Sequence, residues 1–240
     1  MKTIGIIGFG QMGQFMAKQF MKDHNVIVWD PFDKEKEATN IGVAFDTLEN
    51  VAKQEIIFLF PPISKMNECC EALKEHIKPN SILIEGCSVM MEPIKHMLAI
   101  LPKHCEIVGC HPLFGPQSGK HSIKGFTLVL SNVRCIHFEK VKKLFEPLQL
   151  KILEMNPEEH DRLMAKTQAL EQFIGRILID MNIKKEKITT PGFDTLVKFK
   201  EIIKEDSEEL FECIQKHNPF AAEIRKDIIK HVQTIGGRFP

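Results

Sequence analysis

Residues 4–13 read IGIIGFGQMG, so a short apolar strand pattern runs into a G-x-G-x-x-G loop and then into a helical pattern. In such a loop Gly8 permits the tight turn, Gly10 lets the backbone approach a pyrophosphate, and Gly13 lets helix and strand pack closely. The start of the following helix offers free N–H groups and a positive dipole end to phosphates. We therefore predict a Rossmann dinucleotide site here, in which the three glycines, Gln11 and Met12 contact the cofactor.

Asp30 follows the second strand pattern, Val26–Trp29. A carboxylate at that point accepts hydrogen bonds from ribose hydroxyls and repels a 2′-phosphate, so NAD is the expected cofactor and NADP is the less favoured one. The other interpretation is that Asp30 only begins the turn into Pro31. Pro61, which closes the third strand pattern, is assigned to the same cofactor site.

Short apolar runs alternate with amphipathic helical patterns from the start of the chain to about Leu153. This alternation is typical of a parallel sheet that helices cover on both faces. The predicted strands are Ile4–Ile7, Val26–Trp29, Ile56–Phe60, Ile82–Ile84, Ile107–Val108, Phe126–Leu130 and a short one around Lys151–Leu153. The predicted helices between them lie at about 12–21, 65–76, 92–101 and 137–147.

The pattern changes at Asn156, where Asn-Pro-Glu-Glu is a strong helix start. From there we expect only helices, at about 157–182, 193–204, 206–217 and 219–235. The predicted fold class is α/β, a Rossmann-type doubly wound parallel sheet followed by an all-helical C-terminal domain, with domains at 1–154 and 155–240. The first helix has a broad apolar face, which indicates a homodimer interface or, equally well, an intramolecular core.

Composition excludes several classes of protein. Thirty-two basic and thirty-two acidic side chains cancel, so neither a nucleic-acid surface nor a membrane partner is expected. The first residues lack the features of a secretory signal, and no apolar run approaches the length of a membrane span. Seven scattered cysteines and ten unclustered histidines favour free thiols in a cytoplasmic protein that holds no metal.

Candidate chemical groups follow the strands, because ligands of a doubly wound sheet lie beyond the carboxyl ends of its strands. Ser88 follows the fourth strand pattern, and His111 follows the fifth. Imidazole is the natural acceptor for the proton of an alcohol that is being oxidised, and Ser88 could hydrogen-bond to His111 or to the substrate hydroxyl.

Each candidate also has a structural interpretation. His111 could be an ordinary turn residue, and Ser88 could cap the next helix. Cys110 is set aside as a nucleophile because adjacent strand residues point to opposite faces. For His160 and Asp161, in the first turn of the long helix, a structural role is at least as well supported as a catalytic one.

The segment HPLFGP at residues 111–116 resembles the H-P-M-F-G-P signature of prephenate and arogenate dehydrogenases, enzymes of tyrosine biosynthesis. The nucleotide loop, the Gly-Cys-Ser-Val loop at 86–89 and the helix start at 158–170 are also similar to that family, and residues 190–219 are similar to its arogenate-type, plant-like branch. The resemblance implies an NAD-dependent oxidative decarboxylation of arogenate or prephenate. In that reaction His111 takes the 4-hydroxyl proton and Ser88 is its hydrogen-bonding companion, while the helical domain closes the cleft.

The sequence departs from that family at three places. Met90 stands where a lysine often follows Ser-Val, and Gln172 stands where many members have a histidine. No arginine occurs near Val197–Ile203, where bacterial prephenate-specific members bind the side-chain carboxylate, and Lys200 is one of the nearest cations. We assign Gln168, Gln172 and Lys200 to substrate binding, and the plant-like C-terminal segment favours arogenate.

Two other functions fit parts of the sequence. A β-hydroxyacid dehydrogenase has a similar glycine loop and would use a lysine such as Lys166, but it leaves His111 unexplained. A non-catalytic NAD-binding redox sensor would explain the departures from the family pattern.

Overall fold

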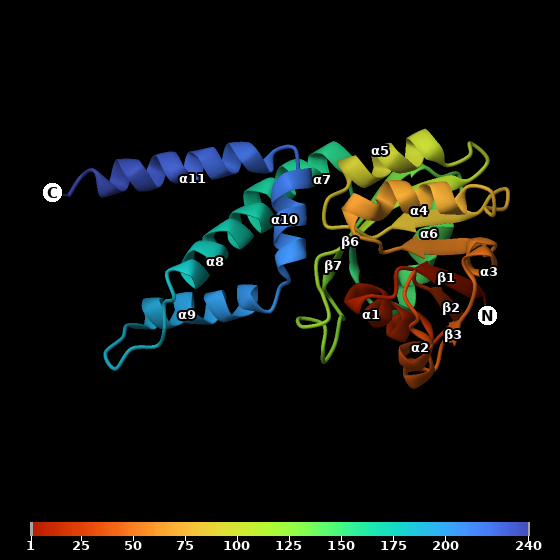
Figure 1. Cartoon of the computed structure of the whole chain (residues 1–240), viewed down its shortest axis with the longest axis horizontal. Coiled ribbons are helices and arrows are strands. Elements are labelled where there is room, and N and C mark those ends of the chain that lie inside the picture. Colours follow the sequence, from red (N-terminus) through yellow and green to blue (C-terminus); the bar gives the residue numbers. More distant parts are fainter. Residues whose placement is uncertain (1, 240) are drawn as a thin grey trace. The chain divides into compact units, whose positions relative to one another are not determined.

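The computed structural model describes residues 2–239, which divide into two compact units, one ending at His160 and the other beginning at Asp161. The first unit holds a single eight-stranded sheet with helices on both faces (Figure 1). Its strands are β1 (Thr3–Ile7), β2 (Asn25–Trp29), β3 (Ala44–Phe45), β4 (Ile56–Leu59), β5 (Ile82–Glu85), β6 (Glu106–Pro112), β7 (Thr127–Arg134) and β8 (Lys151–Glu154). Its helices are α1 (Gln11–Phe20), α2 (Glu35–Ile41), α3 (Leu48–Ala52), α4 (Met66–Leu73), α5 (Met91–Ile100) and α6 (Phe138–Phe145), with 3-10 turns at Ile63–Lys65 and Glu146–Leu148.

The strand order explains where a ligand can bind. The order is β3-β2-β1-β4-β5-β6-β7-β8, so the chain winds from β1 to one edge of the sheet and then returns to continue from β4. Both β2 and β4 pair in parallel with β1. The winding therefore reverses between β1 and β4, and the crevice outside their carboxyl ends is where doubly wound sheets bind ligands.

The sheet is mostly parallel, as the predicted fold class requires, but its last two strands run against the rest. β7 pairs antiparallel with β6, and β8 pairs in parallel with β7. Residues 113–126, between β6 and β7, contain no helix. A parallel return needs a crossover of a dozen or more residues, usually a helix, so β7 comes back antiparallel.

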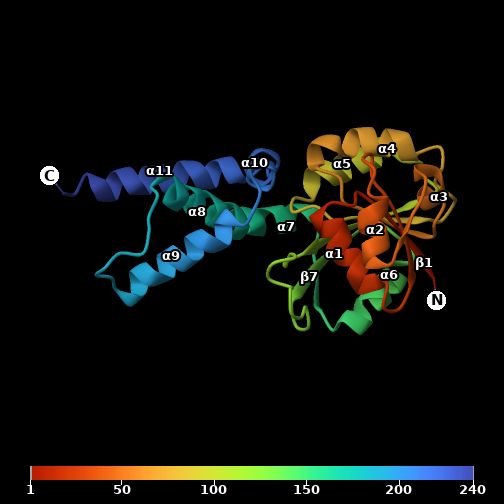
Figure 2. The same cartoon turned by 60° about the horizontal axis from the view of Figure 1, so that its bottom comes forward.

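Helices pack on both faces of the sheet (Figure 2). On one face Phe20 of α1 lies over Phe58 of β4, with 4.7 Å between ring centroids, and both rings contact Phe145 of α6. On the other face Ile94 of α5 is buried with Met90 and Val129. Burial of each such side chain contributes about 1.5–3 kcal/mol to the packing of the helices on the sheet.

The described residues of the second unit form helices joined by turns and loops, without strands. The helix expected at 157–182 forms in three parts, α7 (Pro157–Met164), a π-helical turn (Ala165–Ala169) and α8 (Leu170–Asp180), followed by α9 (Pro191–Lys204), α10 (Glu208–His217) and α11 (Ala221–Gly236). The π-helical turn packs on α10 and α11 through a cluster that includes Ala169, Ile214 and Ala221. Gly175 lets α9 approach α8, since a Cβ there would lie 2.5 Å from the side chain of Ile203.

No helix within residues 2–239 is long and apolar enough to cross a membrane. Over the same residues, no three His, Cys, Asp or Glu side chains group in a way that could hold a metal ion.

Candidate active site

The glycine loop joins β1 to α1 in a conformation that two of its glycines make possible. Gly8 has a φ of +92°, and a Cβ there would lie 2.7 Å from the carbonyl of Phe60 at the end of β4. A Cβ at Gly13 would overlap the carbonyl oxygen of Gly8, so α1 packs directly against the turn. Neither position accepts a side chain without displacing the backbone.

Gly10 differs from these two glycines, because a Cβ added to it would meet nothing within 4 Å. Gly10 and Gln11 are exposed, Met12 is half-buried, and α1 begins without a side-chain cap or an acidic residue in its first turn. The loop therefore leaves open space beside its backbone and free N–H groups at a helix N-terminus. These features fit the pyrophosphate of a dinucleotide.

Asp30 follows β2 and hydrogen-bonds to the loop. Its Oδ2 accepts a hydrogen bond of 2.7 Å from the backbone N–H of Phe9, and its Oδ1 accepts one of 3.1 Å from Phe32. Each carboxylate oxygen can accept more than one hydrogen bond, so the half-buried side chain keeps capacity for ribose hydroxyls. Asp30 thus takes part in the turn and also borders the predicted cofactor site.

The ends of β4 and β5 lie side by side, because the two strands pair in parallel up to Leu59 and Glu85. The ring of Phe60 occupies the space that a Cβ on Gly86 would fill. The buried carboxylate of Glu85 accepts a hydrogen bond of 2.9 Å from the backbone N–H of Cys87. Glu85 thereby orders the loop that leads to Ser88.

Ser88 is half-buried on that loop, beside the strand that carries His111. No hydrogen bond joins Ser88 to His111 in the part of the chain that the structure describes. The alternative role is not observed either, since α5 begins after Met90 without a side-chain cap. The contribution of Ser88 to the site stays a prediction.

His111 lies inside β6 and is 4% exposed. Burial lowers the pKa of its imidazole well below 6.5, and the neighbouring His160 lowers it further. The ring is therefore neutral at physiological pH and has a lone pair on one nitrogen, as a proton acceptor requires.

The partner of His111 is a residue whose role the sequence left undecided. His111 Nδ1 lies 2.9 Å from Nε2 of His160, which is fully buried, and the two rings meet edge to face at 75°. The pair connects the end of β6 to the first turn of α7. Nothing in the sequence predicts this contact, since 49 residues separate the two histidines.

Cys110 is buried against the core on the other face of β6. Burial raises the pKa of its thiol well above 9, and the nearby Glu85 carboxylate adds to the shift. The thiol stays protonated, so it is a poor nucleophile.

The helical unit holds the three residues predicted to bind substrate. The buried Gln172 donates a hydrogen bond to Asp206, and the buried Lys200 donates to the carbonyl of Ile183 and forms an ion pair with Glu201. The ion pair partly neutralises the lysine, so Lys200 is less available to a substrate carboxylate than its charge suggests. Gln168 lies on the π-helical turn, a distortion that frequently occurs at functional sites, and its Oε1 is buried without a hydrogen-bond partner.

Family models and known proteins match most of the chain. A family model for the nucleotide-binding domain of prephenate dehydrogenase matches residues 16–153, and a model described as TYRAAT1-like, C-terminal domain, matches residues 177–239. The chloroplastic arogenate dehydrogenases 2 and 1 of Arabidopsis thaliana are 30% and 31% identical over 232 residues, 92% of this chain. The alignments cover 65% and 36% of the plant proteins, so this chain spans less than two thirds of either one.

A crystal structure of prephenate dehydrogenase from A. aeolicus, in complex with hydroxyphenyl propionate and NAD+, shares the fold. Its TM-score is 0.78 at 20% identity, over 99% of this chain and 91% of that one. The family model, which matches more than half of the sequence, shows more than the fold: the chain belongs to the prephenate dehydrogenase family.

Proposed function

We propose that the chain catalyses the NAD-dependent oxidative decarboxylation of arogenate or prephenate in tyrosine biosynthesis. The observation that carries the proposal is the buried neutral imidazole of His111 at the end of β6, in the same unit as the open glycine loop. Family membership supports the reaction. The similarity to the plant arogenate dehydrogenases favours arogenate over prephenate.

Different residues bind the cofactor and take up the proton in this reaction. The backbone around Gly10 and the start of α1 hold the pyrophosphate, and Asp30 holds a ribose. NAD, when bound, supplies the acceptor for the hydride that leaves the ring carbon bearing the 4-hydroxyl. His111 takes the hydroxyl proton, so that the oxygen becomes a carbonyl. Loss of the ring carboxylate as CO2 leaves its electron pair in the ring, and the aromatic phenolate then takes a proton back.

A substrate panel tests this proposal. Purified protein is incubated with NAD and, separately, with arogenate, prephenate and a 3-hydroxyacid, and NADH absorbance is followed. We expect NADH with arogenate or prephenate only. NADH with the 3-hydroxyacid alone would instead indicate a β-hydroxyacid dehydrogenase, and NAD binding without turnover of any substrate would indicate a sensor.

We propose that Asp30 makes the chain prefer NAD. The substitution Asp30→Asn removes the charge that repels a 2′-phosphate but keeps an oxygen for the Phe9 N–H. We expect the ratio of NADP to NAD dissociation constants to fall about tenfold, the equivalent of ~1.4 kcal/mol. Fluorescence titration of both cofactors measures the ratio, and Asp33→Asn, an exposed change on the same loop, is the control. Tighter binding of NADP than NAD by the unaltered protein would refute the assignment.

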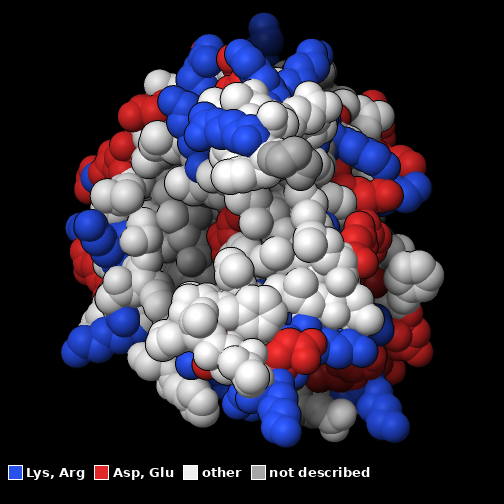
Figure 3. All heavy atoms as spheres, turned by 90° about the vertical axis from the view of Figure 1, so that its left-hand side faces the viewer, with Lys and Arg blue, Asp and Glu red and all other residues white. Residues whose placement is uncertain are grey.

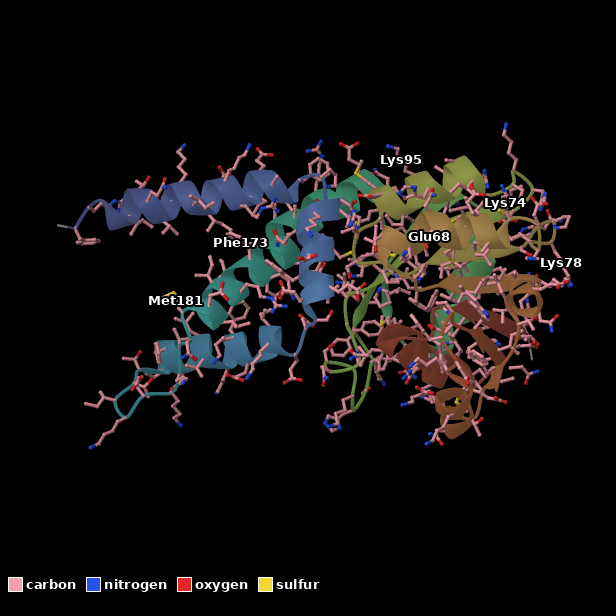
Figure 4. All side chains as sticks on the ribbon, viewed as in Figure 1. Glu68, Lys74, Lys78, Lys95, Phe173 and Met181 are labelled. Carbon is pink, nitrogen blue, oxygen red and sulfur yellow. The ribbon has the colours of Figure 1, made fainter. Side chains whose placement is uncertain are left out.

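We also propose that two copies associate through the helical unit. Ile177 of α8, Met181 just after α8 and Val232 of α11 are 37%, 66% and 62% exposed, and Phe173 lies nearer the start of α8 (Figure 4). A groove of about 420 Å³ lies against α11, the π-helical turn and the first residue of α8, and it is lined by Lys166, Leu170, Ile224, Asp227, Ile228, His231, Val232 and Ile235. Viewed from the left-hand side of Figure 1, the middle of the surface is largely uncharged (Figure 3).

Sedimentation velocity tests the association at micromolar concentration. We expect a species of twice the 27.5 kDa chain mass for the unaltered protein. Val232→Asp should produce monomers, because it places a charge in the apolar groove, whereas Thr234→Asp on the same helix should not. A monomeric unaltered protein would contradict the dimer.

A further inference from the structure

The contact between His111 and His160 restricts the protonation of both rings. The two nitrogens, His111 Nδ1 and His160 Nε2, are 2.9 Å apart, and both residues are at least 96% buried. At that distance one nitrogen donates its hydrogen to the lone pair of the other. Two arrangements satisfy this condition, and they have opposite consequences for His111.

In the first arrangement His111 Nδ1 carries the hydrogen and donates it to His160 Nε2. His111 Nε2 then has the lone pair and can accept a proton. In the second arrangement His160 Nε2 donates, and a neutral His111 must carry its hydrogen on Nε2, where it cannot act as a base. Only the first arrangement is compatible with proton abstraction by the nitrogen of His111 that does not face His160.

We propose that His160 is a positioning residue for His111: its Nε2 accepts the Nδ1–H of His111, fixes that tautomer and sets the orientation of the ring. The proposal rests on the proposed function for its catalytic consequence, but the tautomer is a property of the protein without substrate. Burial supports it, because His111 is 4% exposed and His160 is fully buried, so close-packed neighbours limit the rotation of both rings and maintain their contact.

Nitrogen NMR of the full-length protein labelled at histidine, without substrate, tests the tautomer directly. We expect a protonated Nδ1 and an unprotonated Nε2 for His111, identified by loss of its signals in His111→Asn. In His160→Gln, whose side-chain oxygen can replace Nε2 as an acceptor, the same tautomer should persist. In His160→Leu, which has no acceptor, the two tautomers should mix. His104→Gln, at the partly exposed Nε2 contact to Ile77, is the control.

Kinetics give a second readout that a purely structural role would not produce. In metal sites, removal of a group that orients a ligating histidine typically costs 10- to 100-fold in activity, and by analogy His160→Leu should lower kcat on the order of 10- to 100-fold at unchanged KM. His160→Gln should recover most of that loss. A hydrogen on Nε2 of His111 in the unaltered protein, or folded His160→Leu with unaltered tautomer and kcat, would overturn the proposal.

These outcomes separate the inference from the proposed function. If the chain turns over no substrate, the NMR experiment still decides the tautomer. If His160→Leu does not fold, the unaltered protein and His160→Gln decide it. If the unaltered protein turns over and His160→Leu is equally fast, only the positioning role fails.

Discussion

Replacement of His111 by asparagine should lower kcat about 10²- to 10⁴-fold, the usual contribution of a positioned general base. Asparagine fits the space of the imidazole and offers polar atoms to His160, so the fold should persist, but it cannot take up the hydroxyl proton. NAD affinity should stay unchanged, because the glycine loop and Asp30 are not altered. Steady-state NADH formation and a cofactor titration measure the two quantities.

The pH dependence of the unaltered enzyme provides a check on the same residue. His111 must be neutral to act, and burial lowers its pKa well below 6.5. As the pH falls, kcat/KM should therefore hold through 6.5 and decline only at lower pH. His104→Asn is the matched control for the substitution, and full turnover by folded His111→Asn would exclude His111 as the base.

Gly10→Val should abolish detectable NAD binding and leave the fold intact. The backbone at Gly10 has φ −71° and ψ −165°, a conformation open to any residue, and nothing within 4 Å opposes an added Cβ. The valine methyl groups would instead occupy the space in which we place the pyrophosphate. Loss of the close backbone approach should weaken binding at least about 100-fold, or ~2.7 kcal/mol. Calorimetric titration with NAD measures the effect, and circular dichroism checks the fold.

Two glycine variants define the controls for that experiment. Gly236→Val in α11 also adds a side chain into open space, and it should bind NAD as the unaltered protein does. Gly13→Val should lose NAD binding and, unlike Gly10→Val, should also disrupt the turn, because its Cβ would overlap the Gly8 carbonyl. Unchanged NAD affinity in Gly10→Val would place the cofactor elsewhere.

Local patterns in the sequence predict the parts of this fold that depend on short-range rules. The glycine loop, the buried strands and the caps of the C-terminal helices are of this kind, since periodicity and capping chemistry determine them. β3 was not predicted because its two residues, Ala44 and Phe45, are too few to show an alternating pattern. The sequence predicts no helix between Val108 and Phe126, which already disfavours a parallel return of β7, although the predicted fold class is a parallel sheet. The π-helical turn depends on packing against α10 and α11, which no local pattern encodes.

In the candidate site, too, some features follow from local sequence patterns and others depend on long-range packing. His111 and Asp30 are identifiable because each follows a strand pattern in the sequence, and strand ends meet at one edge of a parallel sheet. In the structure Asp30 follows β2, whereas β6 is longer than predicted and includes His111 near its end. The pairing of His111 with His160 depends instead on the position of α7 after β8, which is determined by pairing between strands far apart in the sequence. For Lys200, the sequence shows the positive charge but not the Glu201 ion pair that partly neutralises it.

The most direct test of the central claim is the stoichiometry of a single reaction. Purified protein is supplied with limiting NAD and an excess of arogenate, and in parallel prephenate, and both NADH and released CO2 are quantified. Oxidative decarboxylation predicts equal amounts of NADH and CO2, together with an aromatic product, for at least one of the two substrates. NADH without CO2, or neither product with either substrate, would contradict the proposed function.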